Sequence, residues 1–305
     1  MSRDLSHDAS HDATAAPQPA VGGLHLGEWA AEFVGTAVLV FGALSSVAIV
    51  FHPGSAFHQW IPSLSVRLLL LGLVFGAIIV GIATSPIGRL SGAHLNPVVT
   101  LAFWITGHVH PHDLLGYWAA QLAGGLLGTI ALRVVWGKRA AGVEYGAITP
   151  EVSTAAAVAV EALMVALLIG AMFLFLSART WVRWTPVAAG LVVAADTWLG
   201  SKLTNTGLNP ARTLGPSIVS GHWQQWWVYF LGPAVGAALV AALWLLVPRV
   251  ILTAKLFHDP RYRSVLRTHL PAAARHPSAE RPERAGSHNA ASSSADGSTG
   301  LDHGD

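Results

Sequence analysis

A polar segment interrupts the apolar second half of the chain: Gly207-Leu208-Asn209-Pro210-Ala211-Arg212-Thr213-Leu214-Gly215-Pro216. Asn209 is a favoured N-cap residue, and Pro210 is a favoured first helical residue because it lacks the N–H that would have no partner there. The helix that begins here is short, since the apolar pattern ends by Gly221, and it cannot cross a bilayer of about 30 Å at about 1.5 Å per residue. The segment therefore predicts a half-helix, preceded by backbone that must be buried in protein or line a watery cavity.

A second segment has the same Asn-Pro start 113 residues earlier (209 − 96): Ser91-Gly92-Ala93-His94-Leu95-Asn96-Pro97-Val98-Val99-Thr100. Asn96-Pro97-Val98 thus corresponds to Asn209-Pro210-Ala211. Interrupted helices in matching positions of two halves are typical of membrane proteins built from inverted repeats. We therefore expect an internal duplication, and the paired glutamates Glu32 and Glu161 support it.

The composition is that of a polytopic membrane protein. Hydrophobic residues make up 52% of the 305 residues and charged residues only 11%, less than half of the usual share of about 25%. There is no cysteine, which excludes disulfides and thiolate metal sites. The basic residues follow the edges of the apolar runs and form no aromatic-rich basic surface, which argues against nucleic-acid binding.

Six apolar runs are long enough to cross a bilayer: Trp29–Val50, Leu64–Thr84, Leu114–Trp136, Ala155–Leu176, Thr185–Gly200 and Trp226–Val247. The half-helices follow the second and fifth runs, so each half of the chain contains three spans. Because three is odd, the second half enters the membrane in the opposite sense. The expected fold is an all-α membrane protein with six transmembrane helices and two half-helices in an inverted repeat.

The ends of the chain have a different composition. Residues 1–27 are rich in Ser, Asp, His, Ala and Pro, and predict a disordered tail. A six-helix membrane domain is expected over residues 28–250, with its repeats at about 28–136 and 154–247. Residues 251–305 are first basic and then rich in Ala, Ser, Pro and Gly, and predict a second disordered tail.

The basic residues also predict an orientation. Arg89, Arg179 and Arg183 lie in connections on the same side as the basic residues that follow the last span. The positive-inside rule then places both termini in the cytoplasm, in a multi-pass protein of the cell membrane. Lys138 and Arg139 lie on the opposite side and go against this assignment.

Residues 91–100 and 208–216 resemble the paired signature loops of the major intrinsic protein family, which contains the aquaporins and the glycerol facilitators. The resemblance covers about Trp29 to Val247. It implies a right-handed bundle of six helices and two half-helices, a pore in each protomer and a homotetramer.

The resemblance also implies a set of pore residues. Asn96 and Asn209 would each offer a side-chain N–H to a passing oxygen, while the positive ends of the half-helices repel cations. Arg212 would stand in a constriction that excludes cations; the alternative is a salt-bridged structural arginine. The other filter positions implied by the resemblance are Phe75, Thr197 and Thr206. Because the stretch from Phe75 to Asn96 carries an extra residue near Pro86, the alternative for Phe75 is an ordinary lipid-facing or core phenylalanine.

Three more residues match supporting positions of the family. Glu32 and Glu161 are expected to accept hydrogen bonds from the irregular backbone before each half-helix, with proton transfer as the alternative. His94 is expected to form structural hydrogen bonds, with gating by protonation as the alternative.

Two departures from the family pattern affect the expected solutes. Val98 replaces a usual alanine, and Thr197 stands where water-specific members commonly carry histidine. Glycerol facilitators carry an aspartate where this chain has Thr213, and Tyr229-Phe230 resembles the aromatic pair of aquaporins. We therefore expect a water channel with a wider filter that also passes other small neutral solutes.

Other functions are alternatives to this one. The alternative within the channel class is a facilitator of glycerol, urea, ammonia, peroxide or a metalloid acid. An ion-coupled secondary transporter would need titratable groups, and only Glu32, Glu161 and Asp196 lie in the spans. Asp196 is expected to lie beside the pore, whereas a slip of one residue would place it in the filter. No catalytic constellation is visible, so we expect no enzyme activity, no cofactor and no metal.

Overall fold

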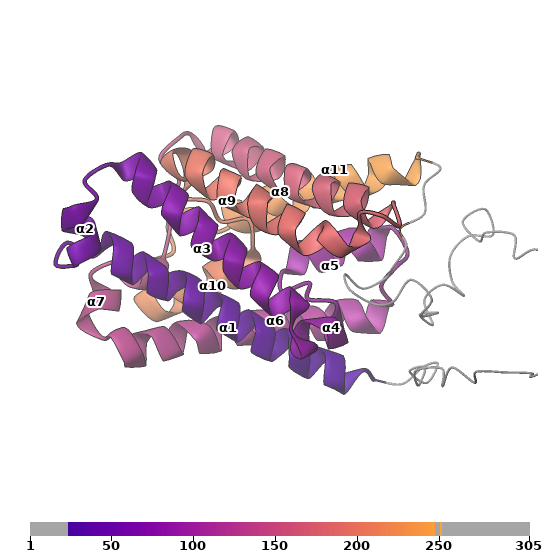
Figure 1. The fold of residues 1–305 in the computed structure, drawn as a ribbon, viewed down its shortest axis with the longest axis horizontal. Coiled ribbons are helices and arrows are strands. Elements are labelled where there is room, and N and C mark those ends of the chain that lie inside the picture. Colours follow the sequence, from indigo (N-terminus) through magenta and orange to yellow (C-terminus); the bar gives the residue numbers. More distant parts are fainter. Residues whose placement is uncertain (1–23, 248–250, 252–305) are drawn as a thin grey trace, which may run out of the picture.

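The structure is a computed structural model that describes residues 24–247 and residue 251, and these residues contain helices and connections but no β-strand. Six long helices form a bundle: α1 (Leu26–Phe51), α3 (Leu64–Thr84), α6 (Pro111–Trp136), α8 (Thr154–Leu176), α9 (Thr185–Thr204) and α11 (Val228–Leu245) (Figure 1). They correspond to the six predicted spans. The predicted tails lie outside the described residues, apart from residues 24–27 and 251.

Membrane-spanning character is clear for most of these helices. Five of them are long and apolar enough to cross a membrane by length and composition, namely α1, α3, α6, α8 and α11. The remaining one, α9, has 20 residues and carries Asp196 and Lys202. It matches the run that the sequence gives as the shortest of the six.

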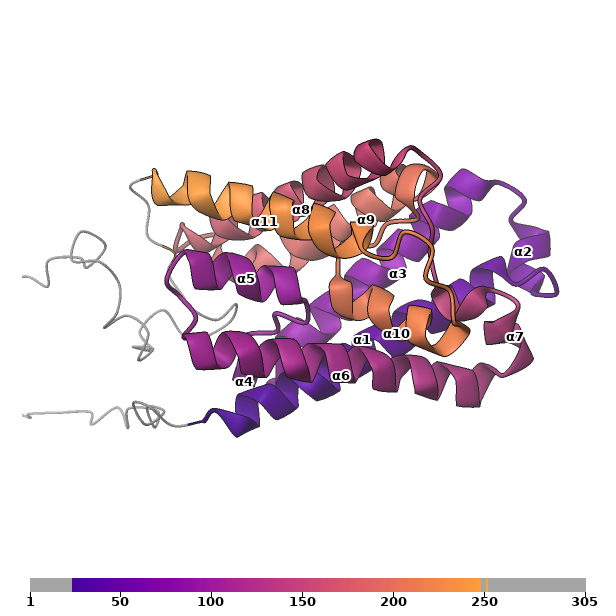
Figure 2. The ribbon, with the colours of Figure 1, turned by 180° about the vertical axis from the view of Figure 1, so that it is seen from behind.

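Two short helices lie inside the bundle. They are α5 (Pro97–Ile105) and α10 (Pro210–Ser220), with 9 and 11 residues. At about 1.5 Å per residue neither can cross a bilayer. Each begins near the middle of the bundle, and they run toward opposite ends of it (Figure 2). This is the arrangement that the two Asn-Pro segments predict. The α10 helix continues through Gly215 and Pro216 to its left-handed C-cap, Gly221.

Short helices form the connections at the two ends of the bundle. The distal end, as we call it, carries α2 (Ala56–Trp60), α7 (Lys138–Ala141) and the 3-10 helix η1 (Glu144–Gly146). The opposite end, the tail end, is where the described chain begins; it carries α4 (Pro86–Ser91) and the 3-10 helix η2 (Val182–Trp184) (Figure 1).

Glycines let the long helices approach closely. A Cβ atom on Gly76 of α3 would lie 2.4 Å from the carbonyl oxygen of Gly190 in α9, and one on Gly236 of α11 would lie 2.1 Å from that of Ala162 in α8. In lipid, helix association depends on such close packing, because burial of apolar surface gives no gain over contact with lipid tails.

A matched pair of substitutions on α3 tests this packing. Gly76→Ala is expected to destabilise the protein by about 1–3 kcal/mol, because backbone atoms cannot move aside for the new methyl group. Gly81→Ala is the control: its Cβ would meet nothing within 4 Å, so alanine is expected to be neutral or to stabilise by up to about 1 kcal/mol. Thermal unfolding in detergent measures both. Equal melting temperatures for the two variants would contradict the packing argument.

Candidate pore and constriction

The backbone before each half-helix has the same unusual conformation. Leu95 and Leu208, directly before the two asparagines, have φ values of 53° and 57°, and Ala93 and Thr206 have 50° and 55°. A left-handed conformation costs a residue with a side chain about 1–2 kcal/mol. The matching positions support the duplication, and the conformation must be held by contacts from elsewhere in the bundle.

A buried glutamate holds each of these loops. Glu161 accepts the N–H groups of Gly207 and Leu208, both at 2.8 Å, and the hydroxyl of Thr204 at 2.7 Å. Its side chain lies on α8 and is 0% exposed. The carboxylate therefore satisfies two backbone donors of the loop that precedes α10.

Glu32 makes the equivalent contacts in the first half. It accepts the N–H groups of His94 at 3.0 Å and Leu95 at 2.7 Å, and the side-chain amide of Gln121 at 2.7 Å. It lies on α1 and is also 0% exposed. Both predicted glutamates thus have backbone N–H groups of the two loops as partners.

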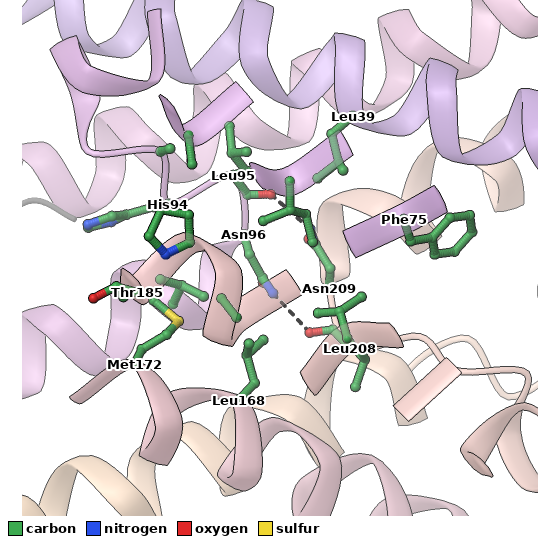
Figure 3. A pocket seen from close by; sticks show the side chains of 17 residues that line it. Leu39, Phe75, His94, Leu95, Asn96, Leu168, Met172, Thr185, Leu208 and Asn209 are labelled. Carbon is green, nitrogen blue, oxygen red and sulfur yellow. Dashed lines mark hydrogen bonds between the residues drawn. The ribbon is translucent and has the colours of Figure 1, made fainter. Parts of the chain in front are cut away.

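The two asparagines meet at the centre of the bundle. Asn96 donates its side-chain N–H to the carbonyl oxygen of Leu208 at 3.0 Å, and Asn209 donates to that of Leu95 at 2.8 Å (Figure 3). Their side-chain oxygens accept the N–H groups of Val98 and Ala211 at 3.1 and 2.9 Å, which caps α5 and α10. An amide nitrogen carries two hydrogens, so each asparagine keeps a second N–H for a solute.

The proline, valine and alanine of the two motifs begin the half-helices or pack inside the protein. Pro97 and Pro210 are the first residues of the half-helices. Val98 and Ala211 are fully packed, with 3% and 0% exposure, and neither lines the pockets described below. Val98 lies in the apolar core, so the valine is accommodated by packing next to the half-helix and not at the wall of a pocket.

An inner pocket extends from the asparagines toward the tail end. Its volume is about 90 Å³, and its wall is mainly apolar, with Leu39, Phe75, Ile79, Leu168 and Met172 among its residues (Figure 3). Its polar groups include both asparagines, His94 and Thr185. A narrow apolar wall with few hydrogen-bonding groups suits small neutral molecules and gives ions nothing to replace their hydration.

An outer pocket opens at the distal end and is larger and more polar. Its volume is about 620 Å³. The polar and charged residues on its wall are Glu144, Thr149, Glu151, Ser201, Lys202, Asn205, Arg212 and His222. Leu68 and Leu71 of α3 also line it.

Between the two pockets lies a short stretch of α3 and α9 that neither pocket includes. On α9, Val193 lines the inner pocket and Ser201 the outer one, and Thr197 lies between them at steps of four residues, on one face of the helix. On α3, the boundary falls between Phe75 and Leu71. We call this part, at the level of Thr197, the constriction.

Two buried donors in this region have no hydrogen-bond partner among the described residues: Thr197 Oγ1 and Arg212 Nε. Thr197 is 1% exposed. The guanidinium of Arg212 donates from Nη1 to the carbonyl oxygen of Gly146 at 3.1 Å. Within the described part of the chain Arg212 forms no ion pair, which argues against the salt-bridged structural alternative.

The four predicted filter residues do not line one cavity. Arg212 lines the outer pocket, Phe75 lines the inner pocket beside the asparagines, and Thr197 lies between the two pockets. Thr206 is buried, and its hydroxyl is hydrogen-bonded to Ser201 Oγ at 2.9 Å and donates to the Asp196 carbonyl oxygen at 3.2 Å.

Of the outer wall, sequence reasoning predicted Arg212 alone, and two of the residues that it missed are Leu71 and Ser201. Each lies one helical turn toward the distal end from a predicted residue, four positions from Phe75 and from Thr197 respectively. The helical period itself could have indicated them.

Asp196 and His94 lie beside the path. Asp196 lines neither pocket, and its Oδ2 atom has no hydrogen-bond partner in the described part of the chain. The side chain of His94 stacks on Phe103 with ring centroids 4.9 Å apart, and its Nδ1 lies 3.1 Å from Thr100 Oγ1. These contacts are those of a packed structural histidine at the wall of the inner pocket.

One group of side chains at the tail end has the composition of a metal site. Ligand atoms of His25, Glu28 and Asp113 lie within 4.8 Å of one another. They have protein partners, however: His25 Nδ1 lies 2.9 Å from both Asp113 oxygens, and Tyr117 donates to Glu28 at 3.0 Å. Both acids lie in first helical turns, where the helix dipole stabilises negative charge without a cation.

Comparisons with known proteins agree with this architecture. The family model "Major intrinsic protein" matches residues 24–244. Aquaporin-8 of Mus musculus is 31% identical over 219 residues, which cover 70% of this chain and 78% of that protein. Aquaporin A of Dictyostelium discoideum is 33% identical over 230 residues, covering 70% and 75%.

A solved structure shows the same fold. The aquaglyceroporin from Plasmodium falciparum has a TM-score of 0.60 and 21% identity, covering 72% of this chain and 95% of that one. The all-α fold with inverted half-helices is thereby confirmed. The family model and the relatives define a multi-pass membrane protein of the channel class. The chain belongs to the major intrinsic protein family.

Proposed function

We propose that this protein is a passive channel for water that also admits other small neutral solutes and excludes ions and protons. The observation that carries the proposal is the pair of asparagines, Asn96 and Asn209, held at the facing starts of two half-helices where both line the inner pocket. The named relatives are aquaporins, and the solved structure is an aquaglyceroporin.

The central geometry supports selection against ions and protons. Two helix N-termini point at the middle of the path and repel cations. A water that accepts N–H groups from Asn96 and Asn209 donates its own hydrogens away from the centre on both sides. Its neighbours cannot then pass a proton through it, so the chain of waters does not conduct protons.

The constriction decides which neutral solutes pass. Thr197 lies at the constriction with an unpartnered hydroxyl, and Arg212 lines the outer pocket on its distal side. A threonine takes less room than the histidine of water-specific relatives. Solutes of the size of ammonia, peroxide or urea are the class that we assign. A facilitator of glycerol or of a metalloid acid is the alternative, because the outer pocket is wide and polar.

An ion-coupled transporter fits the site less well. Glu32 and Glu161 are fully buried and their oxygens accept two backbone N–H groups each, so they are committed to the loops. Enzyme activity has no support either, since the family consists of channels. We assign no cofactor and no metal.

Assembly and orientation are further parts of the proposal. Apolar side chains cover the outside of the bundle, among them Leu127, Leu163, Leu191 and Leu239, as expected for lipid and for neighbouring protomers of a homotetramer. Arg89, Arg179 and Arg183 lie at the tail end, which we place in the cytoplasm of a cell-membrane protein together with both termini.

Thr197→His tests the width of the constriction. The larger side chain is expected to reduce urea flux about tenfold while water flux falls no more than about threefold, because a filter selects by diameter as well as by its donors. Stopped-flow light scattering of proteoliposomes under urea and under impermeant-osmolyte gradients measures both rates. Thr185→His, in the wall of the inner pocket, is the control for a histidine placed elsewhere on the path. An equal loss of both fluxes in Thr197→His would show that Thr197 does not set the width.

A further inference from the structure

The guanidinium of Arg212 is held by a loop at the distal end. This loop, residues 142–150, is the first part of the connection between α7 and α8 and contains η1. The carbonyl oxygen of Gly146 in it accepts the Arg212 Nη1–H at 3.1 Å, whereas Nε has no partner among the described residues. The position of the guanidinium over the path therefore depends on the position of this carbonyl.

The loop has two internal backbone hydrogen bonds, from the Gly146 N–H to the Val143 carbonyl oxygen at 2.8 Å and from the Ala147 N–H to the Glu144 carbonyl oxygen at 2.9 Å, but its conformation is costly. Glu144, Tyr145 and Gly146 have φ values of 50°, 54° and 79°, three left-handed residues in succession. Glycine adopts this conformation freely, but the two residues before it do not. Contacts from outside the loop therefore help these two hydrogen bonds to keep Gly146 where Arg212 can reach it.

His222 supplies such contacts on both sides of Gly146. Its Nδ1 lies 3.3 Å from the Glu144 carboxylate, two residues before Gly146, and its Nε2 lies 2.6 Å from the Thr149 hydroxyl, three residues after it. The Thr149 carbonyl oxygen also accepts the side-chain N–H of Asn205 at 2.8 Å. The Glu144 side chain is 63% exposed, so its pair with His222 is screened by solvent, and the Thr149 contact is the stronger restraint.

His222 is fixed to the helix that carries Arg212. It follows the left-handed C-cap of α10, Gly221, and its backbone N–H donates to Ser220 Oγ at 3.0 Å, which in turn donates to the Pro216 carbonyl oxygen at 2.7 Å. Arg212 lies in the first turn of the same helix. One rigid helix thus contacts the loop through Arg212 at its start and through His222 beyond its end.

We infer that His222 is a positioning residue for the constriction: by holding the 142–150 loop at Glu144 and Thr149, it fixes the Gly146 carbonyl oxygen that orients Arg212. The inference rests on the proposed function, in which Arg212 excludes cations and larger solutes. His222 itself need not touch a solute. Its removal lets the loop relax, and the guanidinium loses its fixed place over the path.

The test compares urea and water permeability in proteoliposomes of the full-length protein. His222→Ala is expected to raise the ratio of urea to water flux at least threefold, and Thr149→Val, which removes one hydroxyl, to raise it in the same direction by less. His112→Ala, a histidine at the tail end of α6 outside this loop, is the matched control and is expected to leave the ratio unchanged. Thr149→Val also keeps the inference testable if His222→Ala does not fold.

A double substitution shows whether His222 acts through Arg212. In an Arg212→Val background, His222→Ala is expected to change the ratio no further. If His222→Ala and Thr149→Val leave the ratio unchanged while Arg212→Val raises it, the inference is wrong and the proposed function stands. If the His222 effect adds to that of Arg212→Val, His222 acts by another route and the inference is again wrong. If Arg212→Val changes nothing, the proposed role of Arg212 fails and the inference fails with it.

Discussion

Arg212→Val is expected to leave the protein folded and to raise the permeability to urea and to small cations about tenfold or more. A unit charge about 4 Å from a passing cation is worth about 4 kcal/mol at an effective dielectric constant of about 20, more than the 1.4 kcal/mol that corresponds to a factor of ten. Arg212 forms no ion pair among the described residues that would be broken by its removal. Its loss therefore changes the path more than the fold.

The measurement combines solute flux and electrical conductance. Urea and water fluxes come from stopped flow, and cation conductance comes from the same protein in planar bilayers. Arg212→Lys is the control, since lysine keeps the charge but loses the planar fork that donates several hydrogen bonds; it is expected to keep cations out while urea flux rises. A folded Arg212→Val protein with native selectivity would show that Arg212 has a structural role and does not select solutes.

Glu161→Leu is expected to have the largest effect on stability. The substitution leaves the N–H groups of Gly207 and Leu208 buried without an acceptor, at a cost of about 1–3 kcal/mol for each. It also releases the hydroxyl of Thr204. The left-handed Leu208 loses the hydrogen bond that holds it, so the first residues of α10 are expected to shift.

Melting temperature in detergent and the yield of folded protein measure this effect. Glu161→Gln is the matched control, because its amide oxygen keeps one acceptor for the two N–H groups, and a smaller loss is expected. Glu32→Leu is expected to behave like Glu161→Leu, since it leaves the N–H groups of His94 and Leu95 without an acceptor. A Glu161→Leu protein with native stability would show that the loop is held by other contacts.

Much of the fold follows from local sequence signals. Asn96-Pro97 and Asn209-Pro210 predict half-helices because cap and proline chemistry acts within a few residues, and the structure begins α5 and α10 at these prolines. The apolar runs predict the six long helices because their length is set by the bilayer. These signals do not depend on how distant parts of the chain meet.

The wall of the path could be predicted only in part. Helix α4 (Pro86–Ser91) occupies the connection in which the sequence suggested an extra residue, and Phe75 lines the inner pocket and not the outer one. The number of residues between Phe75 and Asn96 does not give the position of Phe75 along the path, because the chain between them includes this connection and its helix α4. The position of Thr197 can be counted along the single helix α9. It lies on the face of α9 that lines both pockets, between Val193 and Ser201.

The loop that holds Arg212 had no signal in the sequence. Residues 142–150 have no periodicity, and Glu144 and Tyr145 are not residue types that favour a left-handed conformation. The loop is held in part by a residue far along the chain, since Thr149 is hydrogen-bonded to His222, 73 positions later. Such a contact can be found only when the helices are placed in space.

The most direct test of the central claim is osmotic water permeability measured together with proton and ion conductance in the same proteoliposomes. The native protein is expected to speed osmotic shrinkage well above that of empty vesicles, with no added proton or cation conductance. Water permeability equal to that of empty vesicles, or a sizeable cation current, would contradict the assignment of a passive channel for neutral molecules.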